Sequence, residues 1–197
     1  SKNKTIIVYS LRDIGRSCIY QKQVKKGIAL FERAVYEAKK SKQEYVYKLV
    51  LMELAKYFTN DKEYDKAKEA LRLSDGFTNV VDLSPYYINC GNLYKATNNL
   101  DSAIYFYKKC IMLGGNINDR REAGRSLCVI YFLRGDKADA QKYALMSLDI
   151  TNIVESMTQT TNNDLIYSLN KKIQVEHENS ELQKEKSGQF ILFVLVI

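Results

Sequence analysis

The sequence contains little of what interrupts a helix. It has one proline and nine glycines in 197 residues, and no tryptophan. Proline and glycine are the residues that helices tolerate least, so their scarcity, together with 27% charged residues, favours long helices over a sheet of short strands. The composition therefore predicts an all-α fold.

Motifs for catalysis or metal binding are also missing. The cysteines Cys18, Cys90, Cys110 and Cys128 show no C-x-x-C spacing, and His177 is the only histidine that could join them in a zinc site. His177 lies in a charged stretch typical of an exposed helix, and no glycine-rich phosphate loop or nucleophile elbow is present. We expect no enzymatic activity and no cofactor.

The formal net charge of +7 is concentrated in the first 72 residues, which hold 17 Lys and Arg against 9 Asp and Glu. A basic region can attract acidic partners. However, it contains no arginine-rich run and no nucleic-acid-binding motif, and solvated helix faces are the better explanation of the charge. We expect no direct nucleic-acid binding by this segment.

A two-part pattern recurs four times along the chain. Its first part has apolar or small residues at i, i+3, i+4 and i+7, which is one face of a helix. After a short polar turn, the second part has residues of mostly small, large and small size at i, i+4 and i+7. The first parts are Leu11-Ile14-Gly15-Cys18, Leu51-Leu54-Ala55-Phe58, Tyr87-Cys90-Gly91-Tyr94 and Gly124-Leu127-Cys128-Tyr131. The second parts are Gly27-Phe31-Ala34, Ala67-Leu71-Ser74, Ala103-Tyr107-Cys110 and Ala140-Ala144-Ser147.

This pattern predicts four helical hairpins in which small residues let two helices approach closely. Turns are expected at residues 60–62, 98–99 and 135–136, whose Asn, Asp and Gly residues tolerate the left-handed conformation. Ser84 followed by Pro85 predicts an N-cap and the first turn of the third hairpin. The four cysteines all fall on packing positions, where a buried thiol acts as a small apolar group.

Residues 8–152 resemble the tetratricopeptide repeat, whose unit has 34 residues. The second-helix anchors Gly27, Ala67, Ala103 and Ala140 are 40, 36 and 37 residues apart, so the copies here are longer. The resemblance implies a right-handed α-solenoid of about four hairpins, with a C-terminal capping or stalk helix. It also implies a concave surface, lined by the first helix of each hairpin, that binds proteins or peptides.

Six residues are expected to line that concave surface, because they lie one helical step from the buried face of the first helices. They are Arg12, Arg16, Lys56, Asn92, Lys95 and Arg125. Such a surface would be basic with one amide, and we expect it to bind an acidic or extended peptide segment through charge-assisted hydrogen bonds. A solvated inner face without a ligand is an equally simple interpretation.

Beyond residue 152 the pattern ends. The sequence of residues 153–187 predicts a helical extension. Its apolar stripe of Leu165, Leu169 and Ile173 could cap the repeats, and a charged stalk follows. The last eight residues, 190–197, are all apolar and would form about 12 Å of helix, less than half of the ~30 Å hydrocarbon thickness. We therefore interpret residues 188–197 as the start of a truncated transmembrane helix, with a C-terminal helix that docks on its own domain as the alternative.

Repeats followed by a charged helix and a membrane span resemble the sensory region of membrane-anchored bacterial transcriptional regulators or histidine kinases. The resemblance implies a signalling module with a protein or peptide partner, periplasmic repeats, contact with the membrane through the C-terminal segment, and a fold compatible with a homodimer. The alternative is a soluble, cytoplasmic adaptor or chaperone-like scaffold that binds acidic or extended peptides.

Overall fold

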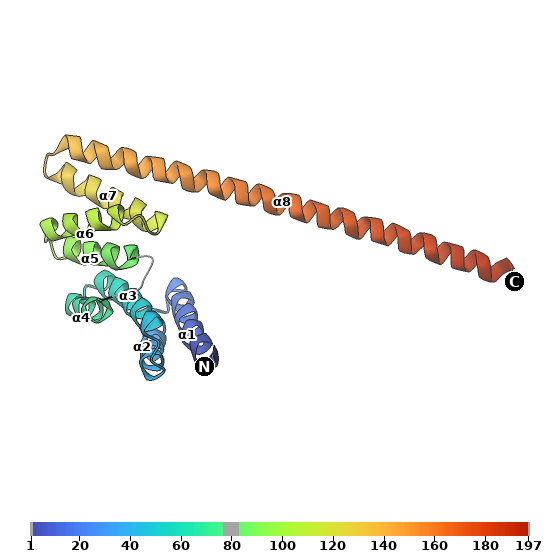
Figure 1. The fold of residues 1–197 in the computed structure, drawn as a ribbon, viewed down its shortest axis with the longest axis horizontal. Helices are drawn as coiled ribbons and strands as arrows, with labels where there is room; N and C mark the ends of the chain where they lie inside the picture. Colours follow the sequence, from blue (N-terminus) through green and yellow to red (C-terminus); the bar gives the residue numbers. More distant parts are fainter. Residues whose placement is uncertain (1, 77–82, 197) are drawn as a thin grey trace. The chain divides into compact units, whose positions relative to one another are not determined.

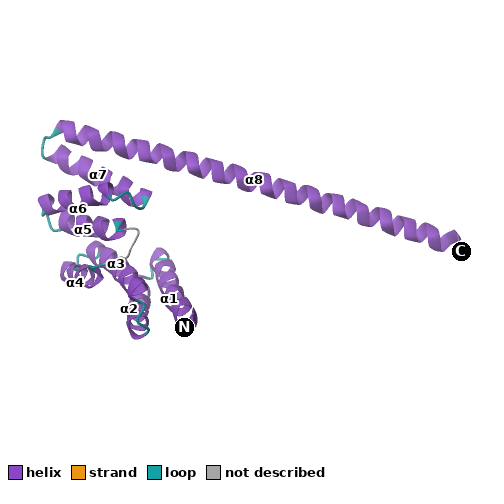
Figure 2. Ribbon diagram, viewed as in Figure 1, coloured by secondary structure: helices purple, strands orange, loops and turns teal. Residues whose placement is uncertain are grey.

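The structure is a computed structural model that describes the backbone of residues 2–76 and 83–196 and the side chains of residues 5–76, 83–172, 174, 175 and 179. In this part of the chain all regular structure is helical and no strand occurs, which confirms the predicted all-α class (Figure 2). The helices are α1 (Lys2–Tyr20), α2 (Val24–Lys40), α3 (Glu44–Asn60), α4 (Tyr64–Ser74), α5 (Ser84–Ala96), α6 (Leu100–Met112), α7 (Ile117–Leu133) and α8 (Lys137–Val196).

The helices pack as consecutive pairs within a first compact unit, residues 1–150 (Figure 1). Helix α1 packs on α2, α3 on α4, and α5 on α6, while α7 packs on the first turns of α8. Contacts between neighbouring pairs run through α3, which touches α1, α2 and α5, and through α7, which touches α5 and α6. Helices α1, α3, α5 and α7 therefore follow one another through the unit, and these are the helices that the repeat pattern places first in each hairpin.

Short turns with one left-handed residue connect most of the helices. Lys22, Lys42, Lys62 and Asn98 have φ values of 63°, 57°, 63° and 59°, and Gly135 has a φ of 80°. These residues let the chain reverse within a few positions, and the turns at 60–62, 98–99 and 135–136 match the prediction. Left-handed lysines were not expected, because lysine has no special tolerance for this conformation. At 60–62 the left-handed residue is Lys62 and not Asn60 or Asp61.

Close helix approach within the hairpins explains the small residues of the pattern. A Cβ atom added to Gly91 would lie 2.5 Å from the ring of Tyr107, and one added to Gly15 would lie 3.4 Å from the ring of Phe31. Tyr107 and Phe31 are both fully buried. In the first and third hairpins, the glycine of one helix therefore accommodates the large residue of the other, as the pattern predicted.

The fourth hairpin differs from the pattern in one position. Ala144 was expected on the packing face, but it is exposed, whereas Tyr143 is buried and its ring stacks on that of Tyr131 at 5.7 Å. Ala140 and Ser147 are buried as expected. The helix therefore presents Tyr143 to the core in place of Ala144.

The start of the third hairpin also differs from the prediction. Ser84 is the first residue of α5 and the preceding Leu83 occupies the N-cap position, so Ser84 does not cap the helix. Its buried hydroxyl donates a hydrogen bond to Asp119 Oδ2 (3.1 Å) and accepts one from the backbone N–H of Asn116 (2.9 Å). Ser84 therefore joins the beginnings of α5 and α7.

Three of the four cysteines, Cys18, Cys90 and Cys110, are buried, and Cys128 is half-buried. Burial raises the pKa of the Cys90 thiol to about 12, so it stays protonated at neutral pH. None of these four described cysteines forms a disulfide, and the burial of three of them agrees with their expected role as small packing groups.

The second compact unit, residues 151–197, consists of the remaining length of α8. Its described side chains are exposed or half-buried, including Leu165 and Leu169 from the predicted capping stripe. Within the part of the chain that the structure describes, no helix combines the length and the apolar character that crossing a membrane requires. The predicted start of a membrane helix, residues 188–197, lies outside the described side chains and stays a prediction.

Candidate functional site

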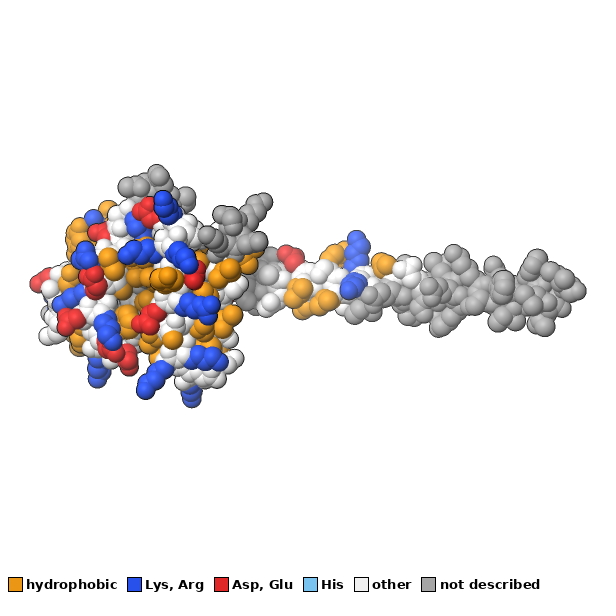
Figure 3. Space-filling model, turned by 90° about the horizontal axis from the view of Figure 1, so that it is seen from below, with side chains coloured by type: hydrophobic (Ala, Val, Ile, Leu, Met, Phe, Trp, Pro, Cys, Tyr) orange, Lys and Arg blue, Asp and Glu red, His pale blue; other side chains and the backbone are white. Residues whose placement is uncertain are grey.

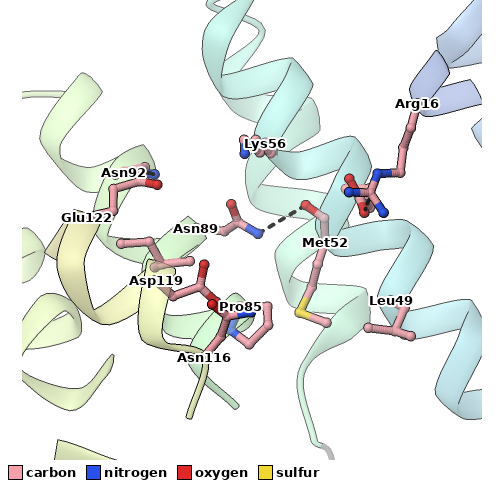
Figure 4. A pocket seen from close by; sticks show the side chains of 12 residues that line it. Arg16, Leu49, Met52, Lys56, Pro85, Asn89, Asn92, Asn116, Asp119 and Glu122 are labelled. Atoms are coloured by element: carbon pink, nitrogen blue, oxygen red, sulfur yellow. Dashed lines mark hydrogen bonds and ion pairs between the residues drawn. The ribbon is translucent and has the colours of Figure 1, made fainter. Parts of the chain in front are cut away.

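A pocket of about 260 Å³ opens between the first helices of the four hairpins (Figure 4). Each of these helices, α1, α3, α5 and α7, contributes side chains to its lining. Asn116, the N-cap residue of α7, lines it too. The lining residues are Arg16 from α1, Leu49, Met52, Glu53 and Lys56 from α3, Pro85, Ile88, Asn89 and Asn92 from α5, and Asn116, Asp119 and Glu122 at the start of α7. The pocket is mostly polar, with apolar side chains at its base in the form of Leu49, Met52 and Ile88.

Asn89 is the most deeply placed polar side chain of the pocket. Only 8% of its surface is exposed, and its Nδ2 donates a hydrogen bond to the backbone oxygen of Met52 on α3 (3.2 Å). This bond fixes the amide plane. The other amide atom, Oδ1, accepts no hydrogen bond from the described residues and points into the pocket (Figure 4). Asn89 therefore offers one fixed acceptor to a ligand.

Asn92 lies one turn further along α5 and is held from both sides. The hydroxyl of Tyr107 donates to Asn92 Oδ1 (2.7 Å), and Asn92 Nδ2 donates to Glu122 Oε1 (2.7 Å). Burial raises the pKa of Tyr107, so its hydroxyl stays protonated and remains a donor at neutral pH. Asn92 thus links α6 to α7 and orients Glu122 at the edge of the pocket.

Charged side chains of both signs surround these amides. Arg16 Nε lies 3.7 Å from Glu53 Oε1, and the Arg16 side chain is 55% exposed. Lys56 is exposed. Asp119 and Glu122 line the pocket from α7. Basic and acidic side chains also alternate over the face of the molecule that Figure 3 presents.

The structure brings together three of the six residues expected at the concave surface. Arg16, Lys56 and Asn92 line the pocket. Arg12 instead donates two hydrogen bonds to Asp13 Oδ1 (3.1 and 2.9 Å), and its guanidinium lies over the ring of Tyr9.

The other two expected residues, Lys95 and Arg125, are also outside the pocket lining. Lys95 donates to Ser126 Oγ (3.1 Å), and Arg125 is exposed on α7. The pocket lining is consequently less basic than the concave surface that the sequence predicted.

Five polar lining residues were not predicted: Glu53, Asn89, Asn116, Asp119 and Glu122. A signal for them exists in the sequence, because Glu53 and Asn89 lie three residues before Lys56 and Asn92, and Asp119 lies three residues before Glu122. Residues three apart share a helix face. The six expected residues are basic side chains and one amide, although the same spacing also includes these acidic residues.

The described side chains offer no metal centre: no three His, Cys, Asp or Glu residues among them lie close enough to hold an ion. His177, the only histidine, lies outside the described side chains. The pocket offers hydrogen-bond acceptors, carboxylates and two cations, which is a set of groups that can hold a polar ligand.

The fold places the chain among all-helical proteins. No protein-family model and no curated protein matches it. Among solved structures, the crystal structure of BtubC (BKLC) from P. vanneervenii is similar, with a TM-score of 0.64 and 15% sequence identity over 77% of this chain and 66% of the BtubC chain. The match thus spans slightly less than two thirds of the length of BtubC, and at this identity the likeness concerns the fold alone.

Proposed function

We propose that this chain is a non-catalytic protein-interaction module, a right-handed solenoid of tetratricopeptide-like hairpins whose pocket binds an extended peptide segment. The observation that carries the proposal is the composition of the pocket: the first helix of every hairpin contributes to it, from Arg16 on α1 to Glu122 on α7. A surface assembled from successive repeats suits an elongated ligand that contacts several of them.

The polar groups of the pocket match the needs of a peptide main chain. An extended peptide presents N–H donors and C=O acceptors that must find partners when water is displaced. Asn89 Oδ1 can accept from an N–H group, and the cations of Arg16 and Lys56 can donate to carbonyl or carboxylate oxygens. Leu49, Met52 and Ile88 offer apolar contact beneath them.

Peptide selection from a random pool tests the proposal. The full chain is incubated with N-acetylated, C-amidated random peptides of about eight residues, which span about 26 Å when extended, and the retained peptides are quantified by mass spectrometry. Arg16→Ala combined with Lys56→Ala should lower retention about tenfold, because each lost charge-assisted hydrogen bond contributes about 1 kcal/mol or more.

Lys25→Ala combined with Lys68→Ala is the matched control, because these exposed lysines lie on α2 and α4, away from the pocket. This control should retain peptides like the wild type, and both double variants should melt within a few degrees of it, since exposed substitutions change stability by about 0.5 kcal/mol. Equal retention by the two double variants would contradict the proposal.

A second candidate function is the sensory part of a membrane-anchored bacterial regulator. Helix α8 favours it, because this 60-residue helix begins in the fourth hairpin and continues to Val196, into the apolar tail. A continuous helix can transmit a shift from a binding domain to a membrane span and an output domain. Sequencing the reading frame beyond Ile197 tests this candidate: about a dozen further apolar residues would support it, and an immediate stop codon would favour an adaptor.

A further inference from the structure

The two sides of the pocket carry opposite net charges. Arg16 and Lys56 come from α1 and α3, and Glu53 neutralises part of that charge by pairing with Arg16. Asp119 and Glu122 come from α7, with no basic residue from that helix in the lining. Figure 4 shows Arg16 and the two α7 carboxylates at opposite ends of the view, with Asn89 between them.

The side of the pocket formed by Arg16 and Lys56, here called the basic side, can bind an anionic group. Lys56 is exposed and forms no ion pair with any described residue, while Arg16 keeps most of its side chain exposed at a pairing distance of 3.7 Å. Both side chains can therefore turn toward a ligand carboxylate without breaking a short internal hydrogen bond.

The side of the pocket formed by Asp119 and Glu122, here called the acidic side, can bind a cationic group. Glu122 accepts a hydrogen bond from Asn92 through Oε1, and this bond holds the exposed carboxylate in place. Asp119 accepts from Ser84 through Oδ2 and lies one helical turn away on the same face of α7. The two carboxylates together favour a lysine or arginine side chain and repel a second carboxylate.

Asn89, in the middle of the pocket, can bind the main chain of a peptide. Its side chain is more than nine-tenths buried, and its amide is fixed by the bond to Met52 O, so its Oδ1 is already oriented before a ligand arrives. A fixed acceptor between two oppositely charged ends suits a peptide N–H group with charged side chains on either side of it.

We infer that the pocket selects an extended peptide with charges of both signs, placing an acidic side chain at Arg16 and Lys56, a basic side chain at Asp119 and Glu122, and a main-chain N–H at Asn89. This inference rests on the proposed function and specifies the charge pattern of the peptide that the pocket binds. A purely acidic peptide would bring carboxylates against Glu122, and a purely basic one would bring cations against Lys56.

Four peptide pools of equal length serve as probes, each about eight residues long, so that an extended peptide spans about 26 Å. The acetylated and amidated peptides carry Ala, Ser, Thr, Val or Asn at all positions except two. Those two positions hold Asp then Lys, Lys then Asp, Asp twice, or Lys twice. Binding of fluorescent pools to the full chain is measured by anisotropy at one ionic strength.

The wild type should bind one of the mixed pools about fivefold more tightly than either single-sign pool, which is the effect of one favourable surface ion pair. Glu122→Lys should move the preference to the double-Asp pool, and Lys56→Glu should move it to the double-Lys pool. Asp149→Lys and Lys68→Glu, which make the same charge changes at exposed positions outside the pocket, should leave the preference unchanged.

The ratio between pools is measured within each variant, so a variant that is partly unfolded still reports a preference. Glu122→Gln is a milder change that keeps an oxygen acceptor for Asn92, and it should remove the preference for the mixed pool. Equal or tighter binding of the double-Asp pool by the wild type would overturn the inference and leave the proposed peptide-binding function standing. Binding of none of the pools would overturn both.

Discussion

At the residue scale, three turns of this protein place an exposed lysine in a conformation that costs free energy. Lys22, Lys42 and Lys62 have φ values of 63°, 57° and 63°, and all three side chains are exposed. The left-handed conformation brings Cβ close to the carbonyl oxygen and costs about 1–2 kcal/mol in a residue other than glycine. Glycine avoids this cost, as Gly135 does at the corresponding turn before α8.

Lys62→Gly should therefore raise the free energy of unfolding by roughly 1 kcal/mol, because the relief of strain exceeds the loss of chain stiffness. Urea denaturation followed by far-UV circular dichroism measures the change. Lys68→Gly is the control of opposite sign, since Lys68 is exposed within α4 and glycine there should lower stability by about 1 kcal/mol. A decrease for Lys62→Gly would show that the lysine side chain stabilises the turn.

At the scale of the elements, the helices and their hairpins could be predicted because packing depends on periodic small and apolar residues along a single chain segment. Gly15 opposite Phe31 and Gly91 opposite Tyr107 follow directly from the pattern. The fourth hairpin departed from it, because Tyr131 stacks on Tyr143, which lies one position before the expected Ala144. Local spacing contains no information about such a pair.

The candidate site was harder to predict than the helices that form it. Each side chain lies on a known helix face, but which faces converge depends on how one hairpin rotates against the next. Asp119 bonds Ser84 and Glu122 bonds Asn92, so two contacts hold α7 against α5, and the part-buried contact between Ser84 and Asp119 spans 35 residues. The sequence indicated a surface with Arg16, Lys56 and Asn92, and the structure added the carboxylates.

Gly91→Ala should destabilise the third hairpin by roughly 2 kcal/mol, which is typical of overpacking. The new methyl group would lie 2.5 Å from the Tyr107 ring, and that ring is fully buried and tied to Asn92 through its hydroxyl. Chemical denaturation of the single variant provides the measurement.

Tyr107→Leu, alone and combined with Gly91→Ala, completes a double-mutant cycle. Since leucine removes the ring atoms that the methyl group meets, the double variant should lose less stability than the sum of the two single losses. Strict additivity would indicate that the cost of Gly91→Ala arises elsewhere in α5.

At the scale of the whole molecule, the buried core of the described residues lies in the first unit. Among the described side chains the last buried core residue is Ile150, and the division into two units falls directly after it. Beyond this point the described side chains of α8 contribute no buried apolar residue. The stability of the first unit should therefore come from residues 1–150 alone.

A chain shortened to residues 1–152 should consequently unfold at the same urea concentration as residues 1–197, because it keeps both clusters of buried residues. A chain shortened further, to residues 1–138, loses Ala140 and Tyr143 from the second cluster and uncovers Leu127 and Tyr131. It should lose about 3 kcal/mol or more, as expected when a large buried side chain is removed. Denaturation of the three chains under identical conditions measures the difference. A lower urea midpoint for residues 1–152 than for residues 1–197 would show that residues 153–197 stabilise the first unit.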